Sequence, residues 1–344
     1  MTAANLDHTD ASTALVGGVV NEALMQKIWD ISAIPLPLSD MISKATHDNK
    51  KNEWTEDKLA DPNLANAVID GADIAQNDTR LGQRLANYTQ ISVKEVQISH
   101  SAEAANSVGG MAKMSKQLVK RQRELRRDLE AISLTHQASV PGDGVTIAGK
   151  TAGFGAQLKT NISLGATGVA GGFNTTTGLF VAPTPGTKRA LSETTIRDVL
   201  QSVYINGGNT TSLMARPIVI RKLSEYLFTG TARVATMQAT QAQSSPKSLT
   251  AYGSVNVFVT DFGQTIQLRD NRLQPTDAAG TSTAYLIDPA HLQQSFLRGI
   301  QTEPLGKTGL SDKNLMSGEW QFNVLNELSQ GAIFAIDEAL AVVA

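Results

Sequence analysis

The chain has 344 residues, of which 30 are Lys or Arg and 32 are Asp or Glu, and it contains no cysteine. The absence of cysteine excludes disulfides, thiolate metal sites and cysteine nucleophiles, and a formal net charge of −2 argues against a chain built to wrap nucleic acid. Charged residues make up only 18% of the chain, against roughly 25% in ordinary soluble domains, so we expect a largely uncharged surface.

Residues 1–44 are predicted to form an N-terminal arm. Residues 1–80 hold 13 acidic and 6 basic side chains, whereas the remainder holds 24 basic and 19 acidic ones. This asymmetry favours an arm that lies on the body of another copy, or it reflects separately solvated faces.

The acidic start does not resemble a secretory signal, and the longest uncharged stretch, residues 160–187, is too polar to span a bilayer. We therefore expect synthesis in the cytoplasm and no membrane contact.

Two extended segments, residues 49–59 and 88–99, are predicted to pair as a long hairpin, the second being rich in β-branched residues. Between them, residues 60–87 contain too few large apolar side chains for a core. A connection of that length in a compact domain is generally a functional or interacting element. The sequence therefore predicts a protruding lobe.

Residues 101–136 show the clearest periodicity of the chain. Apolar side chains recur in steps of three and four, which predicts one long amphipathic helix. Gly109 and Gly110 weaken its start, so a kink or a later beginning is an alternative. The stripe fits either a coiled coil or a helix lying across a sheet. The opposite face is basic and consists of Lys113, Lys116, Lys120, Arg123 and Arg127.

The rest of the chain mixes helices and strands without a regular βαβ repeat, which indicates the α+β class. A helix is expected over residues 192–206, with Ser192 as its N-cap and Gly207 ending it. Residues 217–220 are predicted as a strand and 221–228 as a helix. Further strands are expected at 255–259, 265–269 and 284–287, and a final hairpin is expected from 319–326 and 332–337.

Residues 144–151 match the phosphate-binding pattern G-x-x-x-x-G-K-[ST], with Gly144, Gly149, Lys150 and Thr151 at the defining positions. A true site lies between a buried strand and the start of a helix. Here a predicted helix precedes the motif and a glycine-containing segment follows it, so the context is wrong on both sides. Nucleotide binding is therefore the alternative function, not the favoured one.

Catalytic and metal-binding signals are weak elsewhere. The five histidines are scattered, without the His pair around a Glu that zinc proteases carry, and no G-x-S-x-G motif occurs. We therefore expect neither an enzyme, nor a cofactor, nor a metal.

Several segments in order resemble the major head proteins of tailed bacteriophages that share the Hong Kong 97 fold. Residues 34–62 resemble the opening of that family, where a Pro-containing apolar segment leads into a strand with Glu53-Trp54. Residues 84–99 resemble the return strand, with Arg84 and Asn87 at recurrent positions. The other matching segments are residues 124–130, 152–161, 286–298 and 305–314.

The resemblance implies a Hong Kong 97-type capsid fold of the α+β class. Its parts would be the arm (1–44), an extended loop (45–100), a spine helix with the first part of a peripheral domain (101–189), an axial domain (190–285) and closing strands (286–344). Residues 165–185 match worst.

The resemblance also implies a function, a structural protein that assembles as pentamers and hexamers into an icosahedral head around double-stranded DNA. The implied partners are further copies of the chain, a portal protein, a separate scaffolding protein, a decoration protein and DNA bound without sequence specificity. Some members of this fold cross-link copies through Lys and Asn, but matching positions are not evident. A coiled-coil adaptor is a second alternative. The candidate contacts between subunits are Trp54, Lys58, Arg84, Asn87, Lys113, Lys116, Lys120, Arg123 and Arg127.

Overall fold

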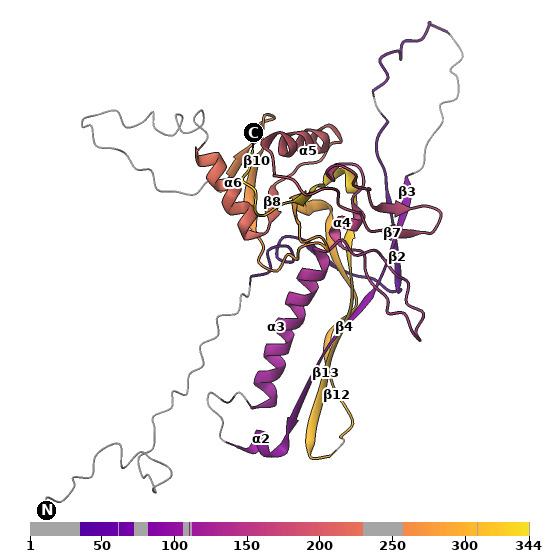
Figure 1. Ribbon diagram of the computed structural model, residues 1–344. Coiled ribbons are helices and arrows are strands. Elements are labelled where there is room, and N and C mark those ends of the chain that lie inside the picture. Colours follow the sequence, from indigo (N-terminus) through magenta and orange to yellow (C-terminus); the bar gives the residue numbers. More distant parts are fainter. Residues whose placement is uncertain are drawn as a thin grey trace, which may run out of the picture.

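The computed structural model describes residues 35–60, 62–71, 82–105, 110, 112–229, 257–307 and 309–343 (Figure 1). Residues 1–34, most of the predicted arm, lie outside this description. Two sheets form the body, and a loop that follows the second strand projects away from it (Figure 1). None of the helices within the described ranges is long and apolar enough to cross a membrane.

The first sheet has four strands in the order β1-β12-β13-β4. Strands β12 and β13 form a long antiparallel hairpin, β4 pairs antiparallel with β13, and β1 runs parallel to β12. Helix α3 lies alongside β4 and β13 (Figure 1). The bounds are β1 (Ser43–Thr46), β4 (Gln90–Ser99), β12 (Leu292–Pro304), β13 (Ser311–Val324) and α3 (Met114–Ser133).

The second sheet has six strands in the order β5-β14-β11-β8-β10-β9, with helices α5 and α6 packed against it. The bounds are β5 (Ile162–Ser163), α5 (Glu193–Ile205), β8 (Ser212–Ala215), α6 (Pro217–Thr229), β9 (Val257–Val259), β10 (Thr265–Asp270), β11 (Ser282–Ile287) and β14 (Gly331–Ile336).

Strand β11 is buried on both faces because it separates two cores. Ala284 and Leu286 contact the core beneath α5 and α6, whereas Tyr285 and Ile287 contact the core shared with α3 and the β12–β13 hairpin. This follows from the two-residue period of a strand. Residues 284–287 of this strand are therefore all apolar although the strand belongs to a mixed sheet.

Two small sheets complete the fold, β2 with β3 and β6 with β7. They meet in a third, small core around Leu85, Ala152 and Phe180. Two short helices and two 3-10 turns connect the larger elements of the described chain. The bounds are β2 (Lys51–Glu56), β3 (Gln83–Tyr88), α2 (His100–Ala104), α4 (Phe154–Gln157), β6 (Gly172–Asn174), β7 (Leu179–Val181), η4 (Pro289–His291) and η5 (Glu327–Ser329).

The predicted long helix is shorter than expected. Helix α2 ends at Ala104 and α3 begins at Met114, so α3 spans 20 residues, or about 30 Å. The alternative of a later beginning, raised from Gly109 and Gly110, is the correct one. The apolar stripe is confirmed, since Leu125 and Leu129 are buried against the body. The coiled-coil interpretation fails because this face packs on the chain's own sheet.

Three strand predictions were wrong. Residues 51–56 pair with β3 (83–88), so only Tyr88 of the predicted partner segment takes part. Residues 90–99 instead form β4 and pair with β13. The predicted lobe is therefore too long at its C-terminal end, because residues 83–87 belong to β3. Residues 217–220 form the first turn of α6, where Pro217 is accommodated because the first helical amides need no intrahelical acceptor. The final hairpin is also wrong, because β13 and β14 lie in different sheets.

Helix α5 confirms the predicted capping. The Ser192 hydroxyl accepts a hydrogen bond from the Thr195 amide at 3.0 Å, and Gly207 follows the helix with φ +88°. The strands predicted at 265–269 and 284–287 are confirmed as β10 and β11, and the described part of 255–259 is β9.

A buried glutamate in α3 fixes the end of the N-terminal segment. The Glu130 carboxyl oxygens accept hydrogen bonds from the Leu38 amide (2.7 Å), from the Ser39 amide (2.9 Å) and hydroxyl (2.6 Å), and from the Asn271 side chain (2.8 Å). Glu130 is fully buried. One side chain therefore joins residues 38–39, helix α3 and the loop after β10.

We predict that Glu130→Gln lowers the free energy of unfolding by about 2–3 kcal/mol, because the new amide group would face backbone donors and leave them unpaired. Glu124→Gln is the matched control. Glu124 makes only a surface ion pair with Arg121 at 2.6 Å, worth at most about 1 kcal/mol. Equal urea midpoints for the two variants would show that Glu130 does not anchor this segment.

Candidate assembly surfaces

The loop between β2 and β3 is the most exposed apolar feature of the described chain. Strands β2 and β3 pair over six positions, from Lys51 opposite Tyr88 to Glu56 opposite Gln83. Beyond this ladder, Leu59 is 91% exposed, Leu64 100% and Ile69 82%. Apolar side chains so far from any core are typical of a surface that binds another protein.

Asn87 anchors this loop to the body through hydrogen bonds within the chain. Its side-chain amide donates to the carbonyl of Phe322 in β13 at 2.7 Å and to the Thr151 hydroxyl at 3.1 Å, and its oxygen accepts from the Ala152 amide at 3.0 Å. Asn87 is fully buried. Every polar group of this side chain is thus used within the chain, and contact of Asn87 with a neighbouring subunit stays a prediction.

The other candidates on the loop lie at its root. Trp54 packs against Phe180 of the same chain, with ring centroids 6.2 Å apart. Arg84 is exposed and forms an ion pair with Glu53. The Lys58 ammonium is exposed and donates to the Asn206 side chain at 3.3 Å. Their contact with a neighbouring copy stays a prediction, and for Trp54 it can involve only the exposed part of the ring.

The basic face of α3 is narrower than the sequence suggested. Lys116, Lys120 and Arg123 are exposed. Lys113, by contrast, is the N-cap of α3 and donates to the Glu103 carbonyl. Arg127 is partly buried, and its Nε atom has no hydrogen-bond partner. An exposed cationic strip of three residues therefore remains, and Lys113 and Arg127 flank it.

The phosphate-loop match does not form a phosphate site. Val140 and Lys150 pair as an antiparallel bridge, and the Asp143 carboxylate accepts from the amides of Val145, Thr146 and Ile147 at 2.7–2.9 Å. These hydrogen bonds, and one from the Thr146 hydroxyl, hold the pKa of Asp143 well below its usual range. The backbone donors that would cradle a phosphate are thus occupied by a carboxylate.

The hydroxyl that would hold magnesium is also occupied. Thr151 is fully buried, and its hydroxyl accepts from the Phe322 amide and from Asn87, both at 3.1 Å. Only the four-residue helix α4 follows the motif. The match in sequence is therefore explained by a turn and a buried structural threonine.

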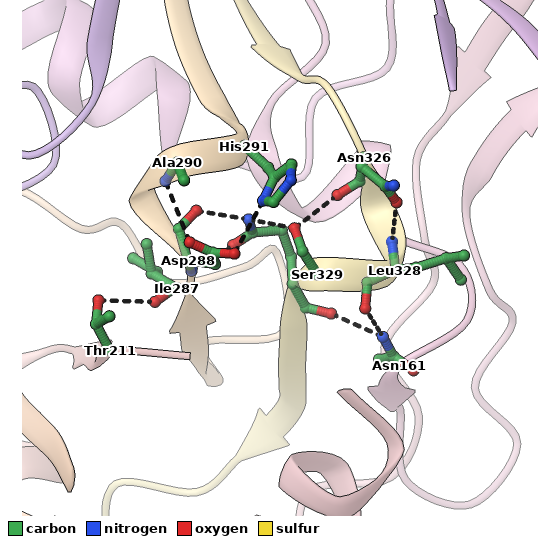
Figure 2. A network of polar contacts seen from close by, with 10 residues as sticks. Asn161, Thr211, Ile287, Asp288, Ala290, His291, Asn326, Leu328 and Ser329 are labelled. Carbon is green, nitrogen blue, oxygen red and sulfur yellow. Dashed lines mark hydrogen bonds and ion pairs between the residues drawn. The ribbon is translucent and has the colours of Figure 1, made fainter. Parts of the chain in front are cut away.

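Polar side chains that the sequence did not single out tie together the segments that connect the two sheets (Figure 2). The Asn161 amide donates to the Leu328 carbonyl at 2.7 Å, and the Gln330 side chain exchanges two hydrogen bonds with the backbone of Asp288, at 2.8 and 2.9 Å. These contacts connect the turn before β14 to the end of β11. The only signal in the sequence was the placement of Asn161 at the end of the 152–161 segment.

Two of the histidines that the structure describes make single polar contacts. His291 Nδ1 lies 2.9 Å from the buried Asp288 carboxyl (Figure 2), yet no described residue places a hydroxyl on that ring. Burial lowers the pKa of His136 to about 4, so this ring is neutral where it meets the Thr283 hydroxyl at 3.0 Å. No group of three or more potential metal ligands occurs among the residues that the structure describes.

The surfaces described so far suit contacts with other proteins, and the comparison with known families shows which family the chain belongs to. The sequence matches the family described as SU10 major capsid protein over residues 4–337. The chain belongs to this family. It is a phage major capsid protein, and its place is the capsid shell of the virion.

Individual relatives agree with this assignment. The chain is 24% identical over 326 residues to the major capsid protein of Escherichia phage Phieco32, covering 87% of this chain and 89% of that protein. A solved structure from Microbacterium phage Oxtober96 superposes with a TM-score of 0.56 at 12% identity and covers 97% of this chain and all of that one. The capsid protein has the Hong Kong 97 fold.

The fold alone does not separate a virus head from other shells. The SrpI encapsulin from Synechococcus elongatus superposes with a TM-score of 0.53 at 9% identity, covering 96% of this chain and 97% of that one. Encapsulin and phage chains thus share one architecture. The family match, not the fold, identifies this chain as a phage capsid protein.

We predict that Thr151→Val lowers the free energy of unfolding by about 1–3 kcal/mol, because it leaves the buried Phe322 amide and Asn87 side chain short of an acceptor. Lys150→Ala, the neighbouring exposed position, should change stability by about 0.5 kcal/mol or less. Neither the unaltered protein nor either variant should bind ATP in a saturable way. Saturable binding that Lys150→Ala abolishes would contradict this interpretation.

Proposed function

We propose that this capsid protein forms pentamers and hexamers that close into an icosahedral shell around double-stranded DNA. The observation that carries the proposal is the β2–β3 loop, which leaves the body with Leu59, Leu64 and Ile69 exposed. Each such side chain would gain roughly 1.5–3 kcal/mol on burial against another surface. A surface with few charges supports the same conclusion, since charged residues are depleted at the centre of protein interfaces.

The loop would reach over a neighbouring copy while its root stays fixed by Asn87. Such a contact is heterologous, because the loop of one copy meets the body of the next, and contacts of this kind close into rings when the rotation fits. Many weak contacts of the same type add up through avidity. In this proposal the peripheral domain would comprise the four-stranded sheet with α3, and the axial domain would comprise α5, α6 and part of the six-stranded sheet.

The cationic strip of Lys116, Lys120 and Arg123 is proposed to contact the acidic N-terminal residues of a neighbouring copy. Residues 1–34 carry four acidic and one basic side chain, so the charges are complementary. The remaining proposed partners are a portal protein, a separate scaffolding protein, a decoration protein and the packaged DNA, which a near-neutral shell would neither grip nor strongly repel. Assembly is proposed to occur in the host cytoplasm.

Negative-stain microscopy of the purified full-length protein tests the proposal. Closed shells or capsomers support it. A monodisperse small particle under all conditions of crowding and salt, with or without a co-expressed scaffolding protein, would overturn it.

We predict that replacing residues 58–81 by a short Gly/Ser turn leaves the subunit folded but abolishes shell formation. The replacement keeps the last pair of the ladder, Glu56 with Gln83. The double variant Leu64→Ser/Ile69→Ser should lower the yield of particles by about tenfold or more, since burial of one such side chain is worth about one decade in affinity. Circular dichroism checks the fold and sedimentation measures assembly. Normal particles from both variants would exclude the loop as a contact.

We predict that Lys120→Glu/Arg123→Glu impairs assembly without a change in the melting temperature of the subunit, because both side chains are exposed. Lys188→Glu/Arg221→Glu makes the same change in net charge at exposed positions away from α3 and should assemble normally. Sedimentation at low and high salt compares the two, since contacts between exposed charges weaken with salt. Equal behaviour of the two variants would exclude a specific role for the cationic strip.

A further inference from the structure

The β6–β7 hairpin holds the root of the β2–β3 loop through an aromatic cluster. Phe180 in β7 stacks on Trp54 in β2, with ring centroids 6.2 Å apart, and meets Phe173 in β6 edge to face at 5.2 Å. The backbone of Phe180 is fixed in turn, because its amide donates to the Ser139 hydroxyl at 2.9 Å and its carbonyl accepts from the Ser139 amide at 3.1 Å. Residues 165–185, the Gly/Thr-rich segment that matches the family worst in sequence, therefore support the root of the loop.

Next to this cluster, two glutamates face each other across a small cavity. The cavity has a volume of about 50 Å³ and is lined by Glu56, Leu85, Phe180, Lys159 and Glu327 among others. The Glu327 carboxyl group is committed to the next segment, since it accepts from the amides of Lys159 (2.7 Å) and Thr160 (3.0 Å) and from the Thr160 hydroxyl (2.5 Å). Glu56 is held less firmly, with one oxygen 3.5 Å from the Glu327 amide.

Glu56 occupies the last position of β2, where the loop leaves the body. A Cβ atom on Gly82, which precedes β3, would lie 2.4 Å from the Glu56 carbonyl oxygen. The backbones of the two segments therefore run unusually close together here. From Asp57 onward the described loop residues are exposed. Glu56 therefore lies at the point from which the loop departs.

We propose that the β6–β7 hairpin, Glu56 and Glu327 form a latch on the root of the β2–β3 loop, and that the latch seats more tightly when Glu56 is protonated. The charged groups that line the cavity with Glu56 are Glu327 from η5 and Lys159 from the segment after α4. Protonation removes the repulsion between the two carboxylates and the cost of burying a charge, and it leaves a hydroxyl that can donate.

The direction of the pH effect follows from the seated state. Burial raises the pKa of Glu56, the nearby Glu327 carboxylate raises it further, and the hydrogen bond from the Glu327 amide opposes both. A carboxyl whose pKa is raised in the seated state favours that state below its ordinary pKa of about 4.5, and this preference is lost as the pH rises through the raised value. The loop should therefore become more ordered on acidification.

Spin-label distance measurements on the full-length chain test the latch. The chain has no cysteine, so labels at Leu64→Cys on the loop and Gln201→Cys on α5 are free of background, and both positions are exposed. Labelled copies are diluted with unlabelled ones so that pairs within one copy dominate. We expect the distance distribution to be narrower at about pH 4 than at about pH 8, because about pH 4 lies below the ordinary pKa of glutamate, where the seated state is favoured.

Three variants separate the latch from a general effect of pH. Glu56→Gln, which imitates the protonated side chain, should give the narrow distribution at both values. Phe173→Ala, at the partly buried edge of the cluster, should give the broad one at both. Glu95→Gln, an exposed glutamate of β4, should respond like the unaltered protein.

A distribution of equal width at both pH values in the unaltered chain would overturn the latch, as would a pH response that survives in Glu56→Gln. The latch builds on the proposed role of the loop but is measured within one copy. A chain that forms no particles can still show the response, so failure of the latch and failure of shell assembly are distinguishable.

Discussion

The hydrogen bonds of Asn87 are the constraint on which the rest of the structure depends. One buried side chain ties β3 to the carbonyl of Phe322 in β13 and to the segment at Thr151 and Ala152. Because an unpaired buried amide costs about 1–3 kcal/mol per lost partner, these three segments have to fold together. The root of the projecting loop is thereby joined to the central hairpin, and β4 follows immediately in the register that pairs it with β13.

Buried polar side chains that bind backbone groups recur at three further places. Glu130 receives the end of the N-terminal segment, Gln157 donates to Phe322 and accepts from Val324, and Gln330 holds the backbone of Asp288. These are polar side chains paired mostly with backbone groups and not with opposite charges. In this way a capsid protein with few charges can hold its connecting segments on the body without relying on buried ion pairs, whose desolvation is costly.

The phosphate-loop match shows why function has to be argued from a site and not from a pattern. The eight residues satisfy the pattern, yet Asp143 occupies the amides and Thr151 is buried as an acceptor within the core. The encapsulin likeness makes the complementary point for folds, since one architecture serves shells of different kinds. Family membership and exposed surfaces together, rather than either motif or fold, support a role in the shell.

The sequence by itself determined the features that rest on local periodicity and capping. These are the caps of α5, the buried stripe of α3 with Leu125 and Leu129, and the face of β13 that buries Trp320, Phe322 and Val324. The order of family-like segments also determined the fold class and the capsid function. Only the tertiary structure decided which strands pair, that Asn87 is an internal anchor, and that the Gly/Thr-rich segment supports the loop. Strand partners and buried polar contacts join residues far apart in the chain, such as Asn87 and Phe322, and no local pattern records the partner that a side chain meets after folding.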